Sequence, residues 1–271
     1  MCRTGRRGTI AAMDSSAPAR HGRLDLERLR RNCARCSLHR LCEPAGIGAS
    51  ELERLDHVVR RRRPVARGER LFHAGDPLGA LFVGREGAFK TVLVSEDGEE
   101  QVLGFHLPGE LIGLDALGSG QHRCEAVALT DASVCEVPYE RLTSIAMQLP
   151  ELQHQLLRII GQRLEREQDH IGMLVRRQAG ERIALFLHGL SRRVAQAGGS
   201  ATSLVLPMSR DDIGHFLGLA LETVSRGFSR LQDEGVIQVS GRRVEILDAD
   251  ELERMANRET DTPRLQARGS A

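Results

Sequence analysis

The sequence has no run of about 18 apolar residues, so it offers no candidate for a membrane-spanning helix. Its first residues are charged but lack the apolar stretch of a secretory signal. These two absences predict a cytoplasmic protein. Cysteine is scarce, at six residues in 271, and a reducing cytosol argues against disulfides among them. Closely spaced cysteines in such a chain indicate metal binding or redox chemistry.

The chain also has little net charge, +1 at pH 7. A site for nucleic acid must therefore be local, because the total charge gives no sign of one. Hydrophobic residues make up 41% of the chain and charged residues 28%, a composition that can bury the core of one large or two ordinary domains. The sequence contains no set of residues that we interpret as catalytic, and we do not expect an enzyme.

Many glycines separate short apolar stretches between residues 68 and 120. Short strands joined by glycine turns predict an antiparallel sandwich or roll. The segment EDGEE at 96–100 suits a hairpin loop, in which Asp97 and Gly98 favour a type I′ turn. We expect the last strand of the roll to end at Pro138.

A long stretch without proline follows Pro150 and predicts one long helix. Its apolar residues are spaced alternately three and four apart, which is the a/d seam of a coiled coil and favours a two-helix dimer interface. A helix packed on its own domain is the alternative. The seam positions are Leu157, Ile160, Leu164, Glu167, Ile171 and Leu174.

Glu167 is the one carboxylate in this seam, and two-fold symmetry would bring it close to its twin. The pair could share a proton, find partners such as Arg163 or Arg166, or keep the dimer weak through repulsion. A weak dimer suits a switch, because a modest signal can then shift the equilibrium. The alternative places Glu167 at the edge of the seam with its carboxylate in water. The predicted dimer switch consists of Glu167, Ile160, Leu164 and Ile171.

Residues 203–247 predict a helix-turn-helix followed by a wing. Ser209 and Asp212 fit a capping box at the start of the first helix. Gly214 allows a close contact between the two helices, and Gly218 supplies the turn.

The second helix is expected over about 220–234, and two short strands around 240–241 form the wing. The front of this helix enters the major groove in helix-turn-helix proteins, so exposed residues there can touch base edges. Arg226 can pair with guanine, and Glu222 can accept a hydrogen bond from cytosine. The alternative is a surface ion pair between these two residues. The predicted DNA contacts are Glu222, Ser225 and Arg226.

The segment NCARCSLHRLCEP contains three thiols in a C-x2-C-x5-C pattern, at Cys33, Cys36 and Cys42. Sites for zinc or iron–sulfur clusters normally use four ligands. His39 could complete a zinc site, whereas a cluster would need one cysteine from elsewhere. An electron-transfer protein is the alternative from another class, although the C-x2-C-x2-C repeat of bacterial ferredoxins is absent.

With these motifs the chain resembles the CRP/FNR superfamily of bacterial transcription regulators. The resemblance covers roughly residues 33–250 and includes FHAGD, GFHLPGELIGLDALGSG, VCEVP and DIGHFLGLALETVSRGFSRLQ. The motif E-x-x-S-R, which here ends at Ser225 and Arg226, is that of the FNR branch. Leu221 stands where the cyclic-AMP branch has an arginine. The resemblance implies a protein that binds palindromic sites in double-stranded DNA, each composed of two TTGAT-like half-sites.

The resemblance implies an α+β fold in which an antiparallel β-roll, similar to cyclic-nucleotide-binding domains, precedes a dimerisation helix and a winged helix-turn-helix. The Fe-S segment and roll would occupy 33–148, the helix 149–178 and the DNA-binding domain 179–250. A flexible arm at 1–32 and a polar tail at 251–271 would flank them. The family also implies a homodimer that contacts RNA polymerase.

A cyclic-nucleotide roll needs a carboxylate for the ribose and an arginine for the phosphate, in the pattern G-E-L followed by R-S/T-A. Residues 109–111 match the first half, but 123–125 read Arg-Cys-Glu and lack the hydroxyl residue. This mismatch argues against a cyclic-nucleotide site. A regulator that binds a cyclic nucleotide and one that is stabilised by zinc are the alternatives to a regulator with an iron–sulfur cluster.

The resemblance implies a [4Fe-4S] cluster that senses oxygen and controls anaerobic or microaerobic gene expression. Cys135 matches the distant cluster ligand of the family, whereas Cys2 and Cys124 match no ligand. We interpret Cys124 as a small buried hydrophobe. The protein would bind DNA as a homodimer while the cluster is intact. The implied ligands are Cys33, Cys36, Cys42 and Cys135.

Overall fold

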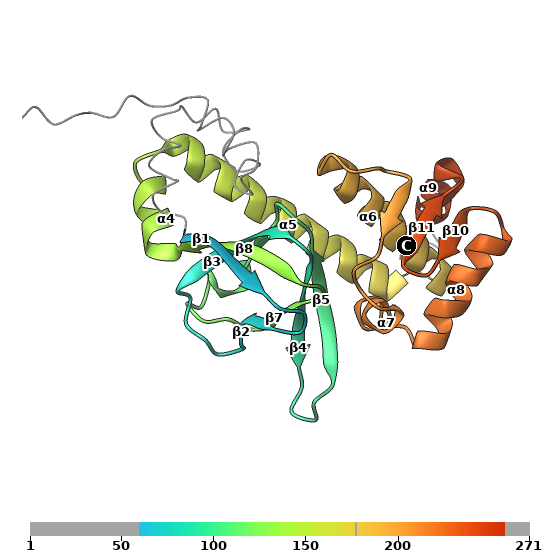
Figure 1. Ribbon diagram of the computed structural model, residues 1–271, viewed down its shortest axis with the longest axis horizontal. Coiled ribbons are helices and arrows are strands. Elements are labelled where there is room, and N and C mark those ends of the chain that lie inside the picture. Colours follow the sequence, from blue (N-terminus) through green and yellow to red (C-terminus); the bar gives the residue numbers. More distant parts are fainter. Residues whose placement is uncertain (1–59, 177, 258–271) are drawn as a thin grey trace, which may run out of the picture.

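In the computed structural model, residues 60–176 and 178–257 are described. Figure 1 shows a roll of strands and a domain of helices and a small sheet, joined by one long helix that crosses the roll. This arrangement confirms the predicted α+β fold, with roll, long helix and winged helix-turn-helix in that order. In the part of the chain that the structure describes, no helix is both long and apolar enough to cross a membrane.

The roll consists of two four-stranded antiparallel sheets, ordered β1-β8-β3-β6 and β2-β7-β4-β5. An apolar core that includes Phe72, Phe82 and Phe89 contains residues from both sheets. The strands are β1 (Arg60–Val65), β2 (Arg70–Phe72), β3 (Ala80–Glu86), β4 (Phe89–Val94), β5 (Glu100–His106), β6 (Leu111–Ile112), β7 (Glu125–Ala128) and β8 (Ala132–Pro138), with a 3-10 turn, η1 (Leu114–Ala116), after β6.

The hairpin between β4 and β5 is present, but its turn differs from the expected type I′ turn. The Gly98 amide donates to the Ser95 carbonyl at 3.0 Å, and the Ser95 amide donates to the Glu99 carbonyl at 3.0 Å. The loop is therefore longer than two residues, and Gly98 follows the turn in a left-handed conformation with φ 82°. A turn closed by a left-handed glycine is the common geometry of hairpin loops of three residues.

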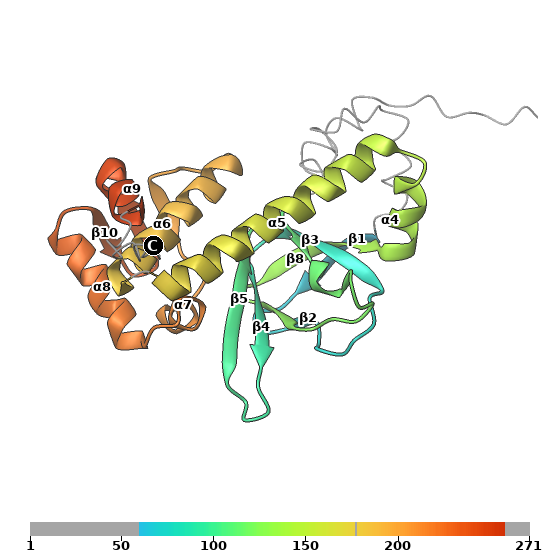
Figure 2. The same ribbon diagram turned by 180° about the vertical axis from the view of Figure 1, so that it is seen from behind.

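Two helices follow β8, which ends at Pro138 as expected. The short α4 (Tyr139–Ala146) was not expected, and it buries Leu142 and Ala146 against the outer face of the β1-β8-β3-β6 sheet. The long α5 (Pro150–Arg176) confirms the helix predicted after Pro150. Leu152 near its start packs on the same outer face, and Figure 2 shows α5 running from there to the DNA-binding domain.

The DNA-binding domain begins with α6 (Ala179–Gln196), whose buried face includes Ile183 and Leu187. Leu252 and Ala256 of the last helix are buried, and α9 packs on α6, so residues 251–257 of the predicted tail belong to a packed helix. The remaining elements are β9 (Ser203–Val205), α7 (Arg210–Leu217), α8 (Leu221–Asp233), β10 (Ile237–Ser240), β11 (Arg243–Ile246) and α9 (Ala249–Asn257).

Candidate DNA interface and sensor site

The helix-turn-helix consists of α7 and α8, and its entry is the expected capping box. The Asp212 amide donates to Ser209 Oγ at 3.0 Å, while Asp212 Oδ2 accepts from the Ser209 amide at 2.8 Å. Gly218 ends α7 in a left-handed conformation, with φ 62°, and its amide donates to the Gly214 carbonyl. These contacts satisfy some of the free backbone groups at each end of α7 and help to fix the direction in which the chain enters α8.

Gly214 lies where α7 approaches the turn most closely. A Cβ added there would lie 2.6 Å from the backbone oxygen of Leu219. We therefore expect Gly214→Ala to lower the free energy of unfolding by about 1–3 kcal/mol, the usual cost of overpacking. Unfolding in urea measures this change in the free energy of unfolding. The control is Gly189→Ala in α6, because a Cβ there meets nothing within 4 Å. Equal stabilities for the two variants would contradict the close contact at Gly214.

The two faces of α8 differ as a recognition helix requires. Its inner face buries Val224, Phe228 and Leu231. Its opposite face exposes the three predicted DNA contacts, and in the described part of the chain Glu222 and Arg226 form no ion pair with each other. Figures 1 and 2 both show α8 at the end of the molecule away from the roll. The exposed side chains are Glu222, Ser225 and Arg226.

The wing and one arginine both contact α8. Strands β10 and β11 pair from Ile237 opposite Ile246 to Ser240 opposite Arg243, and Gly241 is left-handed at the tip of the expected wing. Arg210, at the start of α7, places its guanidinium 3.3 Å from the centre of the Phe228 ring. Burial lowers the pKa of Arg210 to about 10. This cation–π contact was not predicted, because a single arginine at the start of a helix forms no recognisable pattern in the sequence.

In the roll, Cys135 is the only predicted cluster ligand within the described residues; Cys33, Cys36 and Cys42 lie outside them. Cys135 is a free thiol in β8 and is 2% exposed. Because side chains alternate along a strand, it points away from the interior core and packs instead under α4 and α5.

The start of β1 lies beside Cys135. Arg60, the first residue of β1, pairs with Glu136 of β8, so the chain enters the roll next to this thiol. At most ~3.3–3.6 Å per residue, the stretch between Cys42 and Arg60 is long enough to let the N-terminal thiols reach Cys135. Within residues 60–176 and 178–257, no three metal-ligating side chains lie together, so Cys135 needs ligands from outside these ranges to hold a cluster.

Cys124 has a different environment, although it is also 2% exposed. Its side chain lies in the interior core of the roll, among Phe72, Phe82 and Phe89. Burial, together with the nearby Asp115 carboxylate, raises the pKa of the Cys124 thiol to about 12. Only a thiolate binds a metal, so this thiol is a poor ligand. The interpretation of Cys124 as a buried small hydrophobe agrees with this position.

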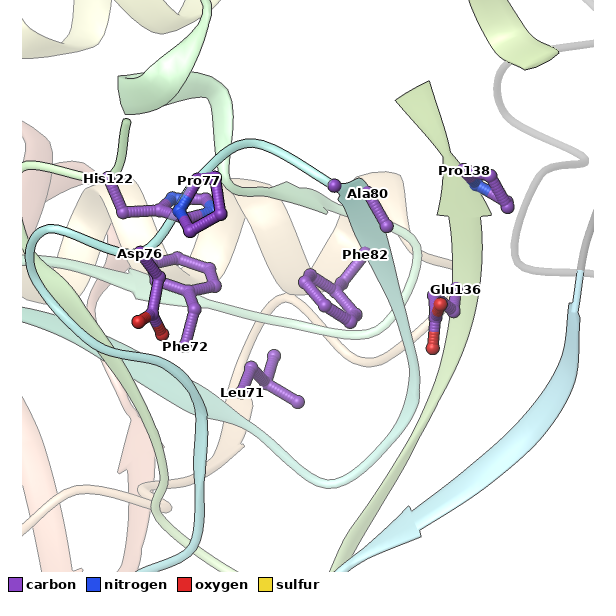
Figure 3. Close-up of a pocket in the computed structure, with 10 residues that line it drawn as sticks. Leu71, Phe72, Asp76, Pro77, Ala80, Phe82, His122, Glu136 and Pro138 are labelled. Atoms are coloured by element: carbon purple, nitrogen blue, oxygen red, sulfur yellow. The ribbon is translucent and has the colours of Figure 1, made fainter. Parts of the chain in front are cut away.

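The residues of the cyclic-nucleotide pattern do not form a nucleotide site in this structure. Glu110 is bonded to Arg193 and Arg166 of the same chain, and the Arg123 side chain is exposed. The roll contains a cavity of about 430 Å³. Figure 3 shows residues that line it, among them Leu71, Phe72, Phe82 and His122. Neither Glu110 nor Arg123 lines this cavity.

The seam of α5 is largely exposed in the single chain. Leu157 is 61% exposed, Leu164 56% and Ile171 62%. Leu174 differs from the expectation, because it packs against the apolar core that the roll shares with the DNA-binding domain. Glu167 Oε1 accepts a hydrogen bond from Arg163 Nε at 2.8 Å. Arg163, one of the two arginines considered as partners of Glu167, therefore forms an ion pair with it within the same chain.

Lys90, the chain's only lysine, forms contacts that were not predicted from the sequence. Its Nζ lies 2.6 Å from Glu100 Oε2 and 2.9 Å from Asp212 Oδ1. Asp212 thus caps α7 and also binds the roll. Gln101 of β5 adds a hydrogen bond to the His215 carbonyl in α7. The helix-turn-helix is therefore fixed to the β4–β5 hairpin by polar contacts.

A β-roll joined through a long helix to a winged helix-turn-helix with an open recognition face defines a DNA-binding transcription regulator. Residues 62–148 match the family "Cyclic nucleotide-binding domain", and 181–255 match "Crp-like helix-turn-helix domain". The chain is 45% identical to the transcriptional activator protein anr of Pseudomonas aeruginosa, over 82% of this chain and 91% of that protein. It belongs to the FNR family, the fumarate and nitrate reduction regulators of the CRP/FNR superfamily.

Two further similarities support this assignment. The fumarate and nitrate reduction regulatory protein of Escherichia coli is 41% identical over 83% of this chain and 90% of that protein. Among solved structures, FixK2 from Bradyrhizobium japonicum matches with a TM-score of 0.67 and 32% identity, over 74% of this chain and 98% of that chain. The fold and the sequence thus place the chain among the same regulators.

Proposed function

We propose that this regulator senses oxygen through a [4Fe-4S] cluster and binds DNA as a homodimer while the cluster is intact. The observation that carries the proposal is the position of Cys135, a free thiol on the outer face of the roll beside the point where the chain enters β1. A ligand there can be joined by thiols that precede β1 in the chain. The proposed ligands are Cys33, Cys36, Cys42 and Cys135.

When bound, the cluster supplies a group that oxygen can convert, so that its loss reports oxygen. The residues of the chain would hold the cluster and connect it to the helices. Cys135 would tie the N-terminal thiols to the face on which α4 and α5 pack. That face is shared with the start of the proposed dimer helix, because Leu152 of α5 lies in the same apolar cluster as Cys135.

Homodimerisation through α5 is supported by its exposed apolar seam, which a second copy of the helix would cover. A dimer would present two α8 helices to two half-sites one helical turn apart, as a palindromic site demands. The family also implies a contact with RNA polymerase once the dimer is on DNA. We propose control of anaerobic or microaerobic genes on this basis.

Zinc and cyclic nucleotides are the alternative signals, and the structure favours the cluster over a nucleotide. The carboxylate and the arginine of the nucleotide pattern, Glu110 and Arg123, do not converge on one cavity. A zinc site formed by the N-terminal thiols and His39 would leave Cys135 without a role.

The test is an anaerobic purification followed by assays for iron and acid-labile sulfide and a visible absorption spectrum. We expect about four irons and four sulfides per chain, with a charge-transfer band that bleaches in air. Zinc without sulfide would overturn the proposal in favour of the structural metal site.

Arg226→Ala tests how α8 reads DNA. Removing a guanidinium that pairs with a base edge should cost about 1–3 kcal/mol and relax specificity at one position of the half-site. Binding of the anaerobic protein to a set of duplexes, each substituted at one position of a TTGAT-like half-site, measures this. The matched control is Arg230→Ala one turn later, where the guanidinium is bonded to Glu234 instead. A uniform loss over all duplexes would mark Arg226 as a phosphate contact.

A further inference from the structure

Glu110 receives an unusual number of hydrogen bonds for one carboxylate. Its Oε1 accepts from Arg193 Nε at 3.0 Å and from Arg166 Nη1 at 3.3 Å. Its Oε2 accepts from Arg193 Nη2 at 2.6 Å and from the Leu107 amide at 2.9 Å. A carboxylate has about four acceptor positions, so this one is saturated. No acceptor is left for the ribose hydroxyl that a G-E-L carboxylate serves in nucleotide-binding rolls.

The partners of Glu110 come from three parts of the protein. Leu107 belongs to the roll, Arg166 to the proposed dimer helix α5, and Arg193 to α6 of the DNA-binding domain. Arg193 also donates to the Phe105 carbonyl of β5 at 2.5 Å. Sensor, dimer helix and DNA-binding domain therefore meet at one side chain that is only 14% exposed.

The surrounding contacts give this junction a defined geometry. Phe105 of the roll lies 6.0 Å from Phe186 of α6 and 5.3 Å from Phe216 of α7, measured between ring centres. Such aromatic pairs and the fork of Arg193 both depend on orientation. A rotation of the DNA-binding domain would therefore break the bidentate pair as well as the ring contacts.

The negative charge of Glu110 compensates the positive charges of Arg166 and Arg193. Burial opposes its ionisation, but the charge and hydrogen bonds of Arg193 and the Leu107 amide outweigh burial and hold the pKa of Glu110 at about 2. The carboxylate is therefore ionised at neutral pH. Without it, Arg166 and Arg193 would face each other with no anion between them, and like charges repel strongly in a partly buried site.

We propose that Glu110 is a positioning residue that couples the orientation of the DNA-binding domain to helix α5. A shift of α5 moves Arg166, and the carboxylate that Arg166 shares with Arg193 transmits the shift to α6. The coupling does not depend on which signal the roll detects, so it goes beyond the proposed sensing of oxygen.

Glu110→Gln removes the charge and keeps the shape of the side chain. We expect the dimerisation constant and the iron content to stay unchanged while affinity for a TTGAT-like duplex falls about ten-fold or more, because the amide nitrogen of Gln replaces an oxygen that accepts two hydrogen bonds. We also expect faster hydrogen exchange in β5 and α6. Exchange is measured without DNA and without a cluster, so its result is independent of the proposed function. Glu110→Asp retains the charge and should recover most of the affinity.

The control is Glu125→Gln within the roll. Glu125 is 16% exposed and bonded to Arg70, so it matches Glu110 in burial and in having an arginine partner, but it does not contact the DNA-binding domain. Should Glu110→Gln fail to fold, Arg193→Met removes the same pair from the other side and should give the same exchange pattern. Wild-type exchange and affinity in the Glu110→Gln protein, or equal losses in Glu125→Gln, would overturn the proposal.

Discussion

Cys135→Ser should abolish the iron–sulfur cluster and with it anaerobic DNA binding. The substitution removes the one proposed ligand that the roll contributes, and a [4Fe-4S] cluster is normally held by four cysteine thiolates. Affinity for the specific duplex should fall to that for unrelated DNA, about 10³-fold or more. The measurements are iron and sulfide content, the visible spectrum and anaerobic gel-shift titration.

Cys124→Ser is the matched control. Both thiols are 2% exposed, so a buried hydroxyl replaces a buried thiol in each variant and the cost in stability should be similar. Because Cys124 points into the interior core, this variant should keep both the cluster and DNA binding. A full cluster in the Cys135→Ser protein would show that the fourth ligand is another residue.

Glu167→Ala should produce a dimer that binds DNA in air. In the single chain Glu167 is 53% exposed and bonded to Arg163, and it interrupts a seam of exposed apolar residues. Pairing of two helices would bring two such carboxylates together and remove water from them, which opposes association. Removing them should strengthen the aerobic dimer by about ten-fold or more, equivalent to ~1.4 kcal/mol.

Sedimentation of the aerobic protein beside an aerobic DNA-binding assay measures both effects. Glu165→Ala is the control, since Glu165 is an exposed carboxylate of α5 that lies outside the predicted seam. A Glu167→Ala protein that stays monomeric and inactive in air would refute the role of Glu167 as a switch. In that case its carboxylate lies at the edge of the interface, in water.

Local patterns predicted the DNA-binding domain well. A capping box and a left-handed glycine act within a few residues, so Ser209, Asp212 and Gly218 could be recognised from their spacing alone. The long helix after Pro150 was equally clear from its period. In the roll, the glycines between short apolar stretches indicated the strands and their approximate ends. They did not specify the type of turn at Gly98, because that depends on the length of the loop.

The contacts between the parts could not be predicted. Lys90 and Asp212 are separated by 122 positions, and Glu110 and Arg193 by 83. No periodicity relates residues so far apart, because only the packed fold brings them together. Helix α4 was missed for a different reason: it spans only eight residues and has no side-chain cap at its start, so it offers neither a long helical period nor a capping motif.

The shared capping residue Asp212 has a consequence for how such regulators can be recombined. One carboxylate closes the first turn of α7 and binds Lys90 of the roll, and the apolar core beneath it contains residues of both domains. The DNA-reading half is thus not an interchangeable module. A chimaera that joined this roll to the DNA-binding domain of another regulator would have to import a surface complementary to the β4–β5 hairpin as well as a new recognition helix.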